Sequence, residues 1–255
     1  MTNAIERCPT GIEGLDELIE GGFPRGRVML LAGDCGTGKS IMAAQFLYAG
    51  ALKYDEPGVY VSLEQSPVLL KQDMKTLGID LEKLEEEKKI IIVDASLSGI
   101  GFMQKQGEYA LSPQEFSVDS ILALISEAVN EIGAKRAVVD SFSALDSLIR
   151  TKKVHMGAGL KEDVRMAILG INYKFQSMGL TSIMISDILD DGKLSQHGIE
   201  EFMADGVITL HYKPFGPDAG RHLIVKKMRS TRHSENINMM EFVEGTGIKI
   251  KSLGV

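Results

Sequence analysis

A short segment near the N-terminus combines glycines, a lysine and a serine at a spacing that suits phosphate binding. Residues 33–40, Gly-Asp-Cys-Gly-Thr-Gly-Lys-Ser, fit the pattern G-x-x-x-x-G-K-[ST]. Glycines let successive backbone N–H groups converge on phosphate oxygens, and the N-terminus of a following helix adds partial positive charge. In this pattern Lys39 reaches the β- and γ-phosphates and Ser40 binds Mg²⁺. The segment therefore predicts a site for ATP and Mg²⁺.

Two apolar segments end in a carboxylate that could complete such a site. Residues 137–141, Ala-Val-Val-Asp-Ser, place Asp140 where P-loop NTPases hold their magnesium. Residues 59–64, Val-Tyr-Val-Ser-Leu-Glu, end in Glu64, which could polarise a water for attack on the γ-phosphate. The alternatives are that Asp140 caps a turn and that Glu64 is a solvated residue at a strand end. Gln65 either orients the same water or is a polar loop residue.

Residues 221–233 form the densest basic segment and contain Arg221, Lys226, Lys227, Arg229 and Arg232. Alternate residues of a strand share a face, so Lys227 and Arg229 would point the same way. Two cations on one strand face can bind a phosphate supplied by a neighbouring molecule. On the residues alone, a solvated or acid-paired edge is the preferred interpretation.

Composition narrows the class of protein. The 255 residues carry a net charge of −7, which argues against non-specific binding of duplex nucleic acid as the main activity. No apolar run approaches the roughly 20 residues of a membrane helix. The N-terminus shows no signal-peptide pattern, and the two cysteines, Cys8 and Cys35, cannot form a disulfide framework. These features predict a cytoplasmic protein with no membrane segment.

Apolar runs alternate with helical patterns along the chain, which predicts one α/β domain over residues 1–255 with a mostly parallel sheet. Helices are expected on both faces, and the final three strands are expected to form an antiparallel C-terminal extension. The expected strands are 27–31, 58–63, 89–93, 136–140, 181–186, 206–212, 222–228 and 236–243, and the expected helices are 39–53, 67–77, 118–132 and 160–178. Residues 95–116 and 150–159 are expected to be long functional or mobile loops.

Several segments together resemble the KaiC branch of the RecA superfamily of P-loop ATPases. They are residues 9–18 and 21–26, the phosphate loop, the Val-Ser-Leu-Glu strand, and residues 200–207 and 227–233. The likeness covers roughly residues 8–250. The last two segments are the ones that distinguish this branch from the RecA and RadA recombinases.

The resemblance implies a hexameric ring in which ATP lies between neighbouring subunits. One subunit would supply the phosphate loop, and the next would supply Lys227 and Arg229. The nucleotide contacts that it implies are Gly36, Thr37, Gly38, Lys39, Ser40, Ile41, Thr76, Lys227, Met228, Arg229, Thr231 and His233. The Mg²⁺ ligands that it implies are Ser40 and Asp140.

The resemblance also bears on the reaction. Glu64 matches the first of two adjacent catalytic glutamates, and Gln65 replaces the second, which predicts slow hydrolysis. Glu200 and Glu201 fall near the Ser and Thr phosphosites of the family, so autokinase activity at that site is expected to be absent.

The expected function is therefore a slow Mg²⁺-dependent ATPase that acts in signalling or regulation with an unidentified protein partner. One alternative is a DNA recombination or repair ATPase of the same fold, against which the acidic pI of about 5.3 argues. The other is a nucleotide-gated binding scaffold with little turnover.

Overall fold

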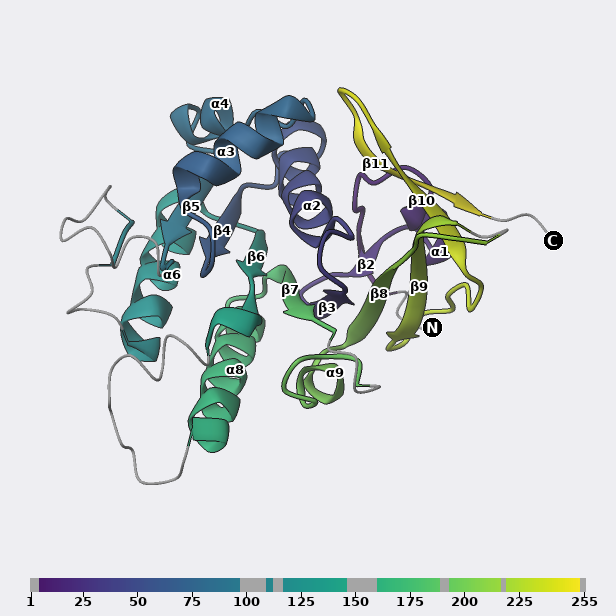
Figure 1. The fold of residues 1–255 in the computed structure, drawn as a ribbon. Coiled ribbons are helices and arrows are strands. Elements are labelled where there is room, and N and C mark those ends of the chain that lie inside the picture. Colours follow the sequence, from purple (N-terminus) through teal and green to yellow (C-terminus); the bar gives the residue numbers. More distant parts are fainter. Residues whose placement is uncertain are drawn as a thin grey trace.

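A nine-stranded sheet runs through the computed structural model, which describes residues 5–96, 109–111, 117–145, 160–188, 193–216 and 219–252 (Figure 1). Its strand order within these residues is β11-β10-β9-β8-β3-β7-β6-β4-β5, and β1 pairs separately with β2. The strands are β1 (Arg7–Cys8), β2 (Phe23–Pro24), β3 (Val28–Gly33), β4 (Gly58–Ser62), β5 (Ile90–Asp94), β6 (Arg136–Asp140), β7 (Thr181–Asp187), β8 (Gly206–Lys213), β9 (Gly220–Met228), β10 (Asn238–Val243) and β11 (Gly247–Ser252). The helices are α1 (Leu15–Leu18), α2 (Lys39–Lys53), α3 (Pro67–Thr76), α4 (Leu81–Glu86), α6 (Val118–Ile132), the 3₁₀ helix η1 (Phe142–Ala144), α8 (Leu160–Ser177) and α9 (Glu200–Met203).

Six neighbouring strands of the sheet, in the order β8-β3-β7-β6-β4-β5, are parallel to one another. Different helices cover the two faces of this parallel part. Tyr60 packs into the core with α2, α3 and α4, whereas Val59 and Val61 pack into the core with α6 and α8. This alternation follows from the two-residue period of a strand. Because both faces are buried, the middle parts of these strands are largely apolar, and the predicted α/β fold with a mostly parallel sheet is confirmed.

The C-terminal part of the sheet differs from the prediction in two details. β8 pairs in parallel with β3 and antiparallel with β9, so it belongs to the parallel part as well as to the extension. β11 is an additional strand that the sequence did not predict, although Ile248 and Ile250 alternate with lysines there.

The short helix α4 is also absent from the predicted elements, because Glu and Lys dominate its sequence.

Helix α2 and α6 have the predicted bounds, and α3 and α8 each end one residue earlier than predicted. α3 begins after Ser66, whose hydroxyl accepts from the Leu69 N–H, and α6 begins after Ser117, which accepts from the Ser120 N–H. Most of the two predicted loops, 95–116 and 150–159, lies outside the described residues. Within those that are described, no helix is long and apolar enough to cross a lipid bilayer.

Arg136 at the start of β6 is fully buried and ties α2 to the sheet. Its Nε donates to Glu56 Oε2 at 2.7 Å and its NH1 donates to the Phe46 carbonyl at 2.9 Å. Its guanidinium also lies 4.5 Å from the centroid of the Phe46 ring. Gly50 of α2 makes room for this arrangement, because a Cβ there would lie 2.5 Å from Arg136 Cδ.

We expect Gly50→Ala to destabilise the protein by roughly 1–3 kcal/mol, because a buried arginine held on three sides has no space to move aside. Gly170→Ala in α8 is the matched control. A Cβ at Gly170 would meet only Leu122 Cδ1, at 3.6 Å, so Ala should stabilise the helix by about 0.5–1 kcal/mol. Urea unfolding of both variants is the measurement, and equal stability of the two would contradict the packing described for Arg136.

Candidate nucleotide site

The phosphate loop joins the end of β3 to the start of α2. Gly38 caps the helix in a left-handed conformation, with φ of 102° and no side-chain hydrogen bond. The first N–H groups of the helix, those of Lys39, Ser40 and Ile41, have no intrahelical partner and can bind an anion. Gly33, at the start of the loop, packs closely against β8. A Cβ at this position would lie 2.7 Å from the Leu210 carbonyl oxygen, so there is no space for a side chain.

The ammonium group of Lys39 lies over this loop. Its Nζ donates to the carbonyls of Gly33 and Asp34, both at 2.9 Å, and forms an ion pair with Asp187 Oδ1 at 2.9 Å. Asp187 ends β7, which neighbours β3 in the sheet. Asp187 is not among the residues predicted from the sequence, although it ends an apolar strand as Asp140 does, and that pattern could have identified it.

Asp140 and Ser40 supply oxygen atoms suited to Mg²⁺. Asp140 Oδ2 accepts from the Tyr60 hydroxyl at 2.5 Å, and the Ser40 hydroxyl lies close enough to this carboxylate to lower its pKa. Burial raises the pKa of Asp140, while these hydroxyls and the charge of Lys39 oppose the rise.

A carboxylate and a hydroxyl are hard oxygen ligands, and Mg²⁺ commonly uses one or two carboxylates together with phosphates and water. The residues that the structure describes contain no group of three or more His, Cys, Asp or Glu side chains arranged around a metal position. The donor set thus fits a Mg²⁺ that shares its coordination with a nucleotide, and it does not fit a metal held by protein alone.

Glu64 lies two residues beyond the end of β4, beside Asp140. Its Oε1 accepts from the Ser141 hydroxyl at 2.7 Å, which fixes its orientation next to Asp140. Burial raises the pKa of Glu64, and the negative charges of Asp140 and Asp187 contribute to the rise. A carboxylate with a raised pKa is a better general base than an ordinary glutamate.

Gln65 and Thr76 both bond to Asp73 of α3. Gln65 Nε2 donates to Asp73 Oδ2 at 2.6 Å, and Thr76 Oγ1 donates to the Asp73 carbonyl at 2.7 Å. The amide of Gln65 is therefore directed toward α3, as the loop-residue interpretation expects. Thr76 lies at the end of α3, with its hydroxyl engaged in its own helix.

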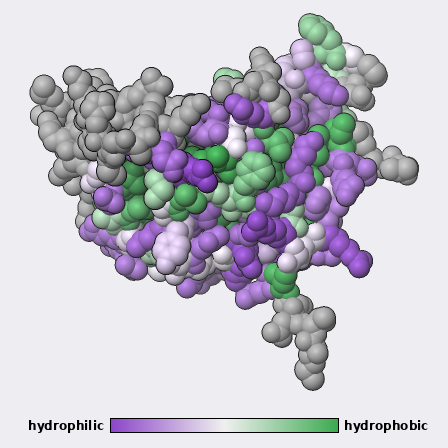
Figure 2. Space-filling view, turned by 90° about the horizontal axis from the view of Figure 1, so that it is seen from below, coloured by the Kyte–Doolittle hydropathy of each residue, from purple (hydrophilic) through white to green (hydrophobic). Residues whose placement is uncertain are grey.

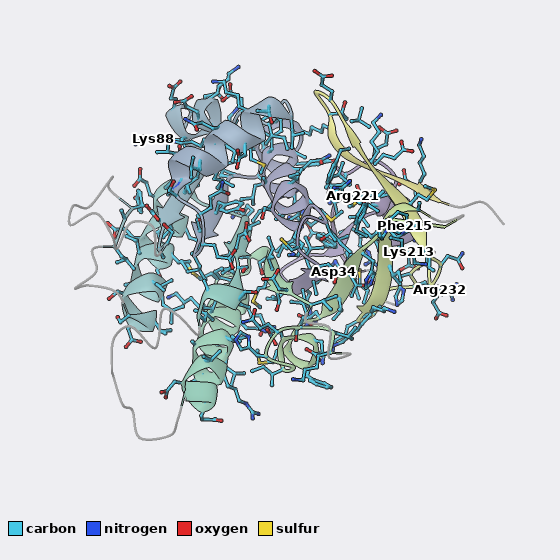
Figure 3. The ribbon with its side chains drawn as sticks, viewed as in Figure 1. Asp34, Lys88, Lys213, Phe215, Arg221 and Arg232 are labelled. Carbon is cyan, nitrogen blue, oxygen red and sulfur yellow. The ribbon has the colours of Figure 1, made fainter. Side chains whose placement is uncertain are left out.

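Arg221 of β9 supports the phosphate loop from the outside (Figure 3). Its Nε and NH2 both donate to the Gly36 carbonyl at 3.3 Å. Its guanidinium lies 4.3 Å from the Phe242 ring centroid and 5.2 Å from that of Tyr212. Phe242 also packs on the loop, because a Cβ at Gly38 would lie 2.7 Å from Phe242 Cζ. The sequence placed Arg221 in the basic segment but could not show which element it contacts.

Lys227 and Arg229 lie at the other end of the sheet. Lys227 Nζ donates to the carbonyls of Glu201 at 3.1 Å and Ala204 at 2.7 Å. Arg229 NH1 contacts Asp205 Oδ1 at 3.4 Å. Lys227 and Arg229 are two residues apart in the chain, and burial and the charge of Arg229 lower the pKa of Lys227.

The pairing of β3, β8 and β9 shows how far the phosphate loop lies from Lys227 and Arg229 along the strands. Gly33 pairs with Leu210, and Leu210 pairs with Leu223, so the phosphate loop is level with Leu223 of β9. Met228 lies five residues further along β9, which is about 17 Å at the rise of a strand. Lys227 and Arg229 therefore do not reach the phosphate loop of their own chain in this structure.

The remaining residues predicted to contact nucleotide, Met228, Thr231 and His233, lie at the end of β9 or just after it. The side chain of Met228 is 5% exposed and packs in the core, so only its backbone is accessible. Thr231 accepts from Arg7 NH1 at 2.6 Å, and His233 Nδ1 lies 3.2 Å from the Ser234 carbonyl. Neither of these two hydrogen bonds joins its residue to the phosphate loop.

Glu200 is buried at the start of α9 and is held by several donors. Ser186 and Ser195 donate to its carboxylate at 3.0 and 2.7 Å, and His197 Nδ1 lies 2.9 Å from Oε1. Burial alone would raise the pKa of Glu200, but the hydrogen bonds from His197 and Ser195 lower it to about 2. This side chain is an ionised structural group at the segment where the family carries phosphosites.

Comparison with known proteins identifies the family of this chain. The model of the KaiC ATPase family matches residues 8–254. The chain belongs to the KaiC ATPase family. The KaiC-like protein PH0186 of Pyrococcus horikoshii has a similar crystal structure, with a TM-score of 0.79, 38% identity, and coverage of 97% of this chain and 99% of that one.

Among KaiC-family relatives, a UPF0273 protein of Methanocaldococcus jannaschii is 36% identical over 90% of both chains. The circadian clock protein KaiC2 of Synechocystis is 34% identical over 97% of this chain but only 40% of its own length. The chain therefore spans nearly the whole of the first relative and less than half of the clock protein. Membership of a KaiC-like ATPase family implies that the chain binds nucleotide and is an ATPase.

We expect Lys39→Ala to lower ATP affinity by roughly 10- to 100-fold, because it removes the charged partner of the β- and γ-phosphates. Asp140→Asn should retain binding but impair Mg²⁺-dependent turnover. Calorimetric titration with ATP, with and without Mg²⁺, measures both effects. Lys53→Ala, at the exposed C-terminal end of α2, is the control and should bind as the wild type does. Unchanged affinity in Lys39→Ala would contradict the site.

The raised pKa of Glu64 predicts a pH dependence. A general base works only when ionised, so kcat should fall as the pH decreases through the pKa of Glu64, above the ordinary value of 4.5. Saturating Mg²⁺ should suppress the contribution of Asp140, because the metal competes with the proton there. Glu64→Gln should show low turnover without this acid limb. An acid limb that is identical in wild type and Glu64→Gln would contradict the role of Glu64.

Proposed function

We propose that this chain hydrolyses ATP slowly, with Mg²⁺, at sites formed between neighbouring copies in a ring. The observation that carries the proposal is the separation of the phosphate loop from Lys227 and Arg229 at opposite ends of the sheet. Because these two cations do not reach their own phosphate loop, a site that uses both halves needs two chains. A hexamer is the number of copies that the family resemblance favours.

The residues at the phosphate loop would divide the chemistry as follows. Lys39 and the first N–H groups of α2 bind the phosphates, while Ser40 and Asp140 hold Mg²⁺, which supplies charge neutralisation when bound. Glu64, held by Ser141, accepts the proton of the attacking water. Lys227 and Arg229 of the next subunit would stabilise the charge that develops on the transferred phosphoryl group.

Slow turnover is part of the proposal. Gln65 stands at the position of the second family glutamate and its amide is bonded to Asp73, so Glu64 would act without a second glutamate next to it in the chain. The carboxylate of Glu200 and its bonded partners occupy the segment where the family carries phosphosites, which supports an ATPase without autokinase activity there. A slow ATPase suits a regulatory role in the cytoplasm with a protein partner.

The end of the molecule that carries α9 fits a contact with another copy. Figure 2 views this side and shows apolar side chains at the centre, bordered by polar and charged ones. Phe202 of α9 is 71% exposed, and the Lys227 ammonium is bonded to the carbonyls on either side of it in the chain, those of Glu201 and Ala204. Aromatic side chains are enriched at protein interfaces relative to the rest of the surface, which supports a contact at Phe202.

Mixing two inactive variants tests the shared site. Lys39→Ala lacks a working phosphate loop, and Arg229→Ala lacks the cation that the neighbour needs. In mixed rings, some interfaces combine the intact phosphate loop of one variant with the intact Arg229 of the other. We therefore expect each variant alone to have low turnover and the mixture to regain a measurable fraction of wild-type activity.

Co-assembly is checked by native mass spectrometry of the mixture with ATP and Mg²⁺. The control mixes Lys39→Ala with Glu64→Gln, which both damage the same half-site and should not recover. Mixed rings that form but stay inactive would reject the shared site. High turnover in Glu64→Gln would instead favour a different base, and no turnover in the wild type would favour a nucleotide-gated scaffold.

A further inference from the structure

The buried carboxylate of Asp205 joins two arginines at the far end of the sheet. Arg27 NH1 lies 3.3 Å and Arg229 NH1 lies 3.4 Å from the same atom, Asp205 Oδ1. The other carboxylate oxygen accepts from the Val28 N–H at 3.4 Å and from Gln176 Nε2 at 3.5 Å. Asp205 therefore connects the start of β3, the end of β9 and helix α8.

The two arginines extend outward from this anchor. The side chain of Asp205 is only 2% exposed, whereas those of Arg27 and Arg229 are 56% and 57% exposed. Each guanidinium contacts the buried carboxylate through its NH1, and more than half of each arginine side chain remains accessible from outside. Such an arrangement orders flexible side chains before a ligand arrives, which reduces the entropy lost on binding.

The local charges favour an anionic ligand. One carboxylate oxygen neutralises two guanidinium groups only in part, and Lys227 adds a third cation beside Arg229. Because both NH1 atoms contact one oxygen, the guanidinium groups are close enough to bind one phosphate group or two adjacent ones. A polyphosphate would relieve the repulsion among these cations.

We infer that Arg27 is a third basic residue of the cluster that binds the neighbouring copy's ATP phosphates, and that Asp205 is a positioning residue for Arg27 and Arg229. This inference rests on the proposed shared site. It adds a residue that directly precedes β3, the strand that carries the phosphate loop of its own chain at its other end.

Two other roles for Arg27 lead to different results. Arg27 could be a structural partner of Asp205, in which case its loss would change stability alone. Alternatively, Arg27 could influence the phosphate loop of its own chain through β3. Turnover of mixed rings distinguishes these roles. Activity returns only when two variants damage different halves of the shared site, which are the phosphate loop of one chain and the basic cluster of the next.

Arg27→Met keeps a stem of similar length and removes the charge. Alone, it should lower turnover by about tenfold, the effect expected for one charge-assisted hydrogen bond. Mixed with Lys39→Ala, it should regain activity, since some interfaces then contain an intact phosphate loop and an intact Arg27. Mixed with Arg229→Ala, it should regain none, because both variants damage the same half-site. Asp205→Asn, if it folds, should group with Arg229→Ala in the same way.

Lys226→Met is the matched control, since Lys226 is an exposed cation of β9 next to Lys227 and lies outside the cluster. It should retain wild-type turnover. Thermal unfolding of all variants is measured alongside. An Arg27→Met protein with normal turnover and a lower Tm would show a structural role and overturn the inference.

Recovery of Arg27→Met with Arg229→Ala, but not with Lys39→Ala, would also overturn the inference, because Arg27 would then act on its own chain's site. The reference mixture of Lys39→Ala with Arg229→Ala separates this failure from failure of the proposed function. If the reference mixture recovers, only the role of Arg27 is in question. If it forms mixed rings without recovery, the shared site and the role of Arg27 are both rejected.

Discussion

The register of β3 between β7 and β8 is the constraint on which the rest of the site depends. Gly33 at the end of β3 pairs with Asp187 and Leu210, so the phosphate loop, the Asp187 carboxylate and β8 meet at one edge of the sheet. The start of β3 lies by Asp205, one strand length away. A single strand thus places phosphate-binding backbone at one end and the cation Arg27 at the other. In a ring, a strand with this arrangement would connect each nucleotide to the next.

At the phosphate loop, the structure brings together groups whose charges oppose one another. Lys39 and the helix N-terminus are positive, while Asp140, Asp187 and Glu64 are negative and at least partly desolvated. Burial raises the pKa of both Asp140 and Glu64, and the hydroxyls of Tyr60, Ser40 and Ser141 compensate in part. A site of this kind can accept a magnesium ion and a polyphosphate together, because the metal neutralises carboxylates and the lysine neutralises phosphate.

Residue patterns predict a site correctly where one local segment of the chain contains the whole signal. The phosphate loop, α2 and the apolar strands ending at Asp140 and near Glu64 lie within short stretches of chain, so their residue types predicted both the element and its position. Asp187 carried a similar signal that was overlooked. Arg136 carried none, because a lysine- or arginine-rich strand end reads as exposed. Only the packing of Phe46, Gly50 and Glu56 around it shows that this arginine is a core residue.

The sequence by itself determined the fold class, the phosphate-binding chemistry and, through family resemblance, the candidate partners of that chemistry. Tertiary structure alone decided which of those residues lie together. It placed Arg221 and Phe242 against the loop, it turned Gln65 toward Asp73, and it separated Lys227 and Arg229 from Lys39 by the length of a strand. The physical reason is that strand order and direction depend on pairing between segments far apart in the chain. Local residue patterns carry no information about which end of a neighbouring strand will lie beside them.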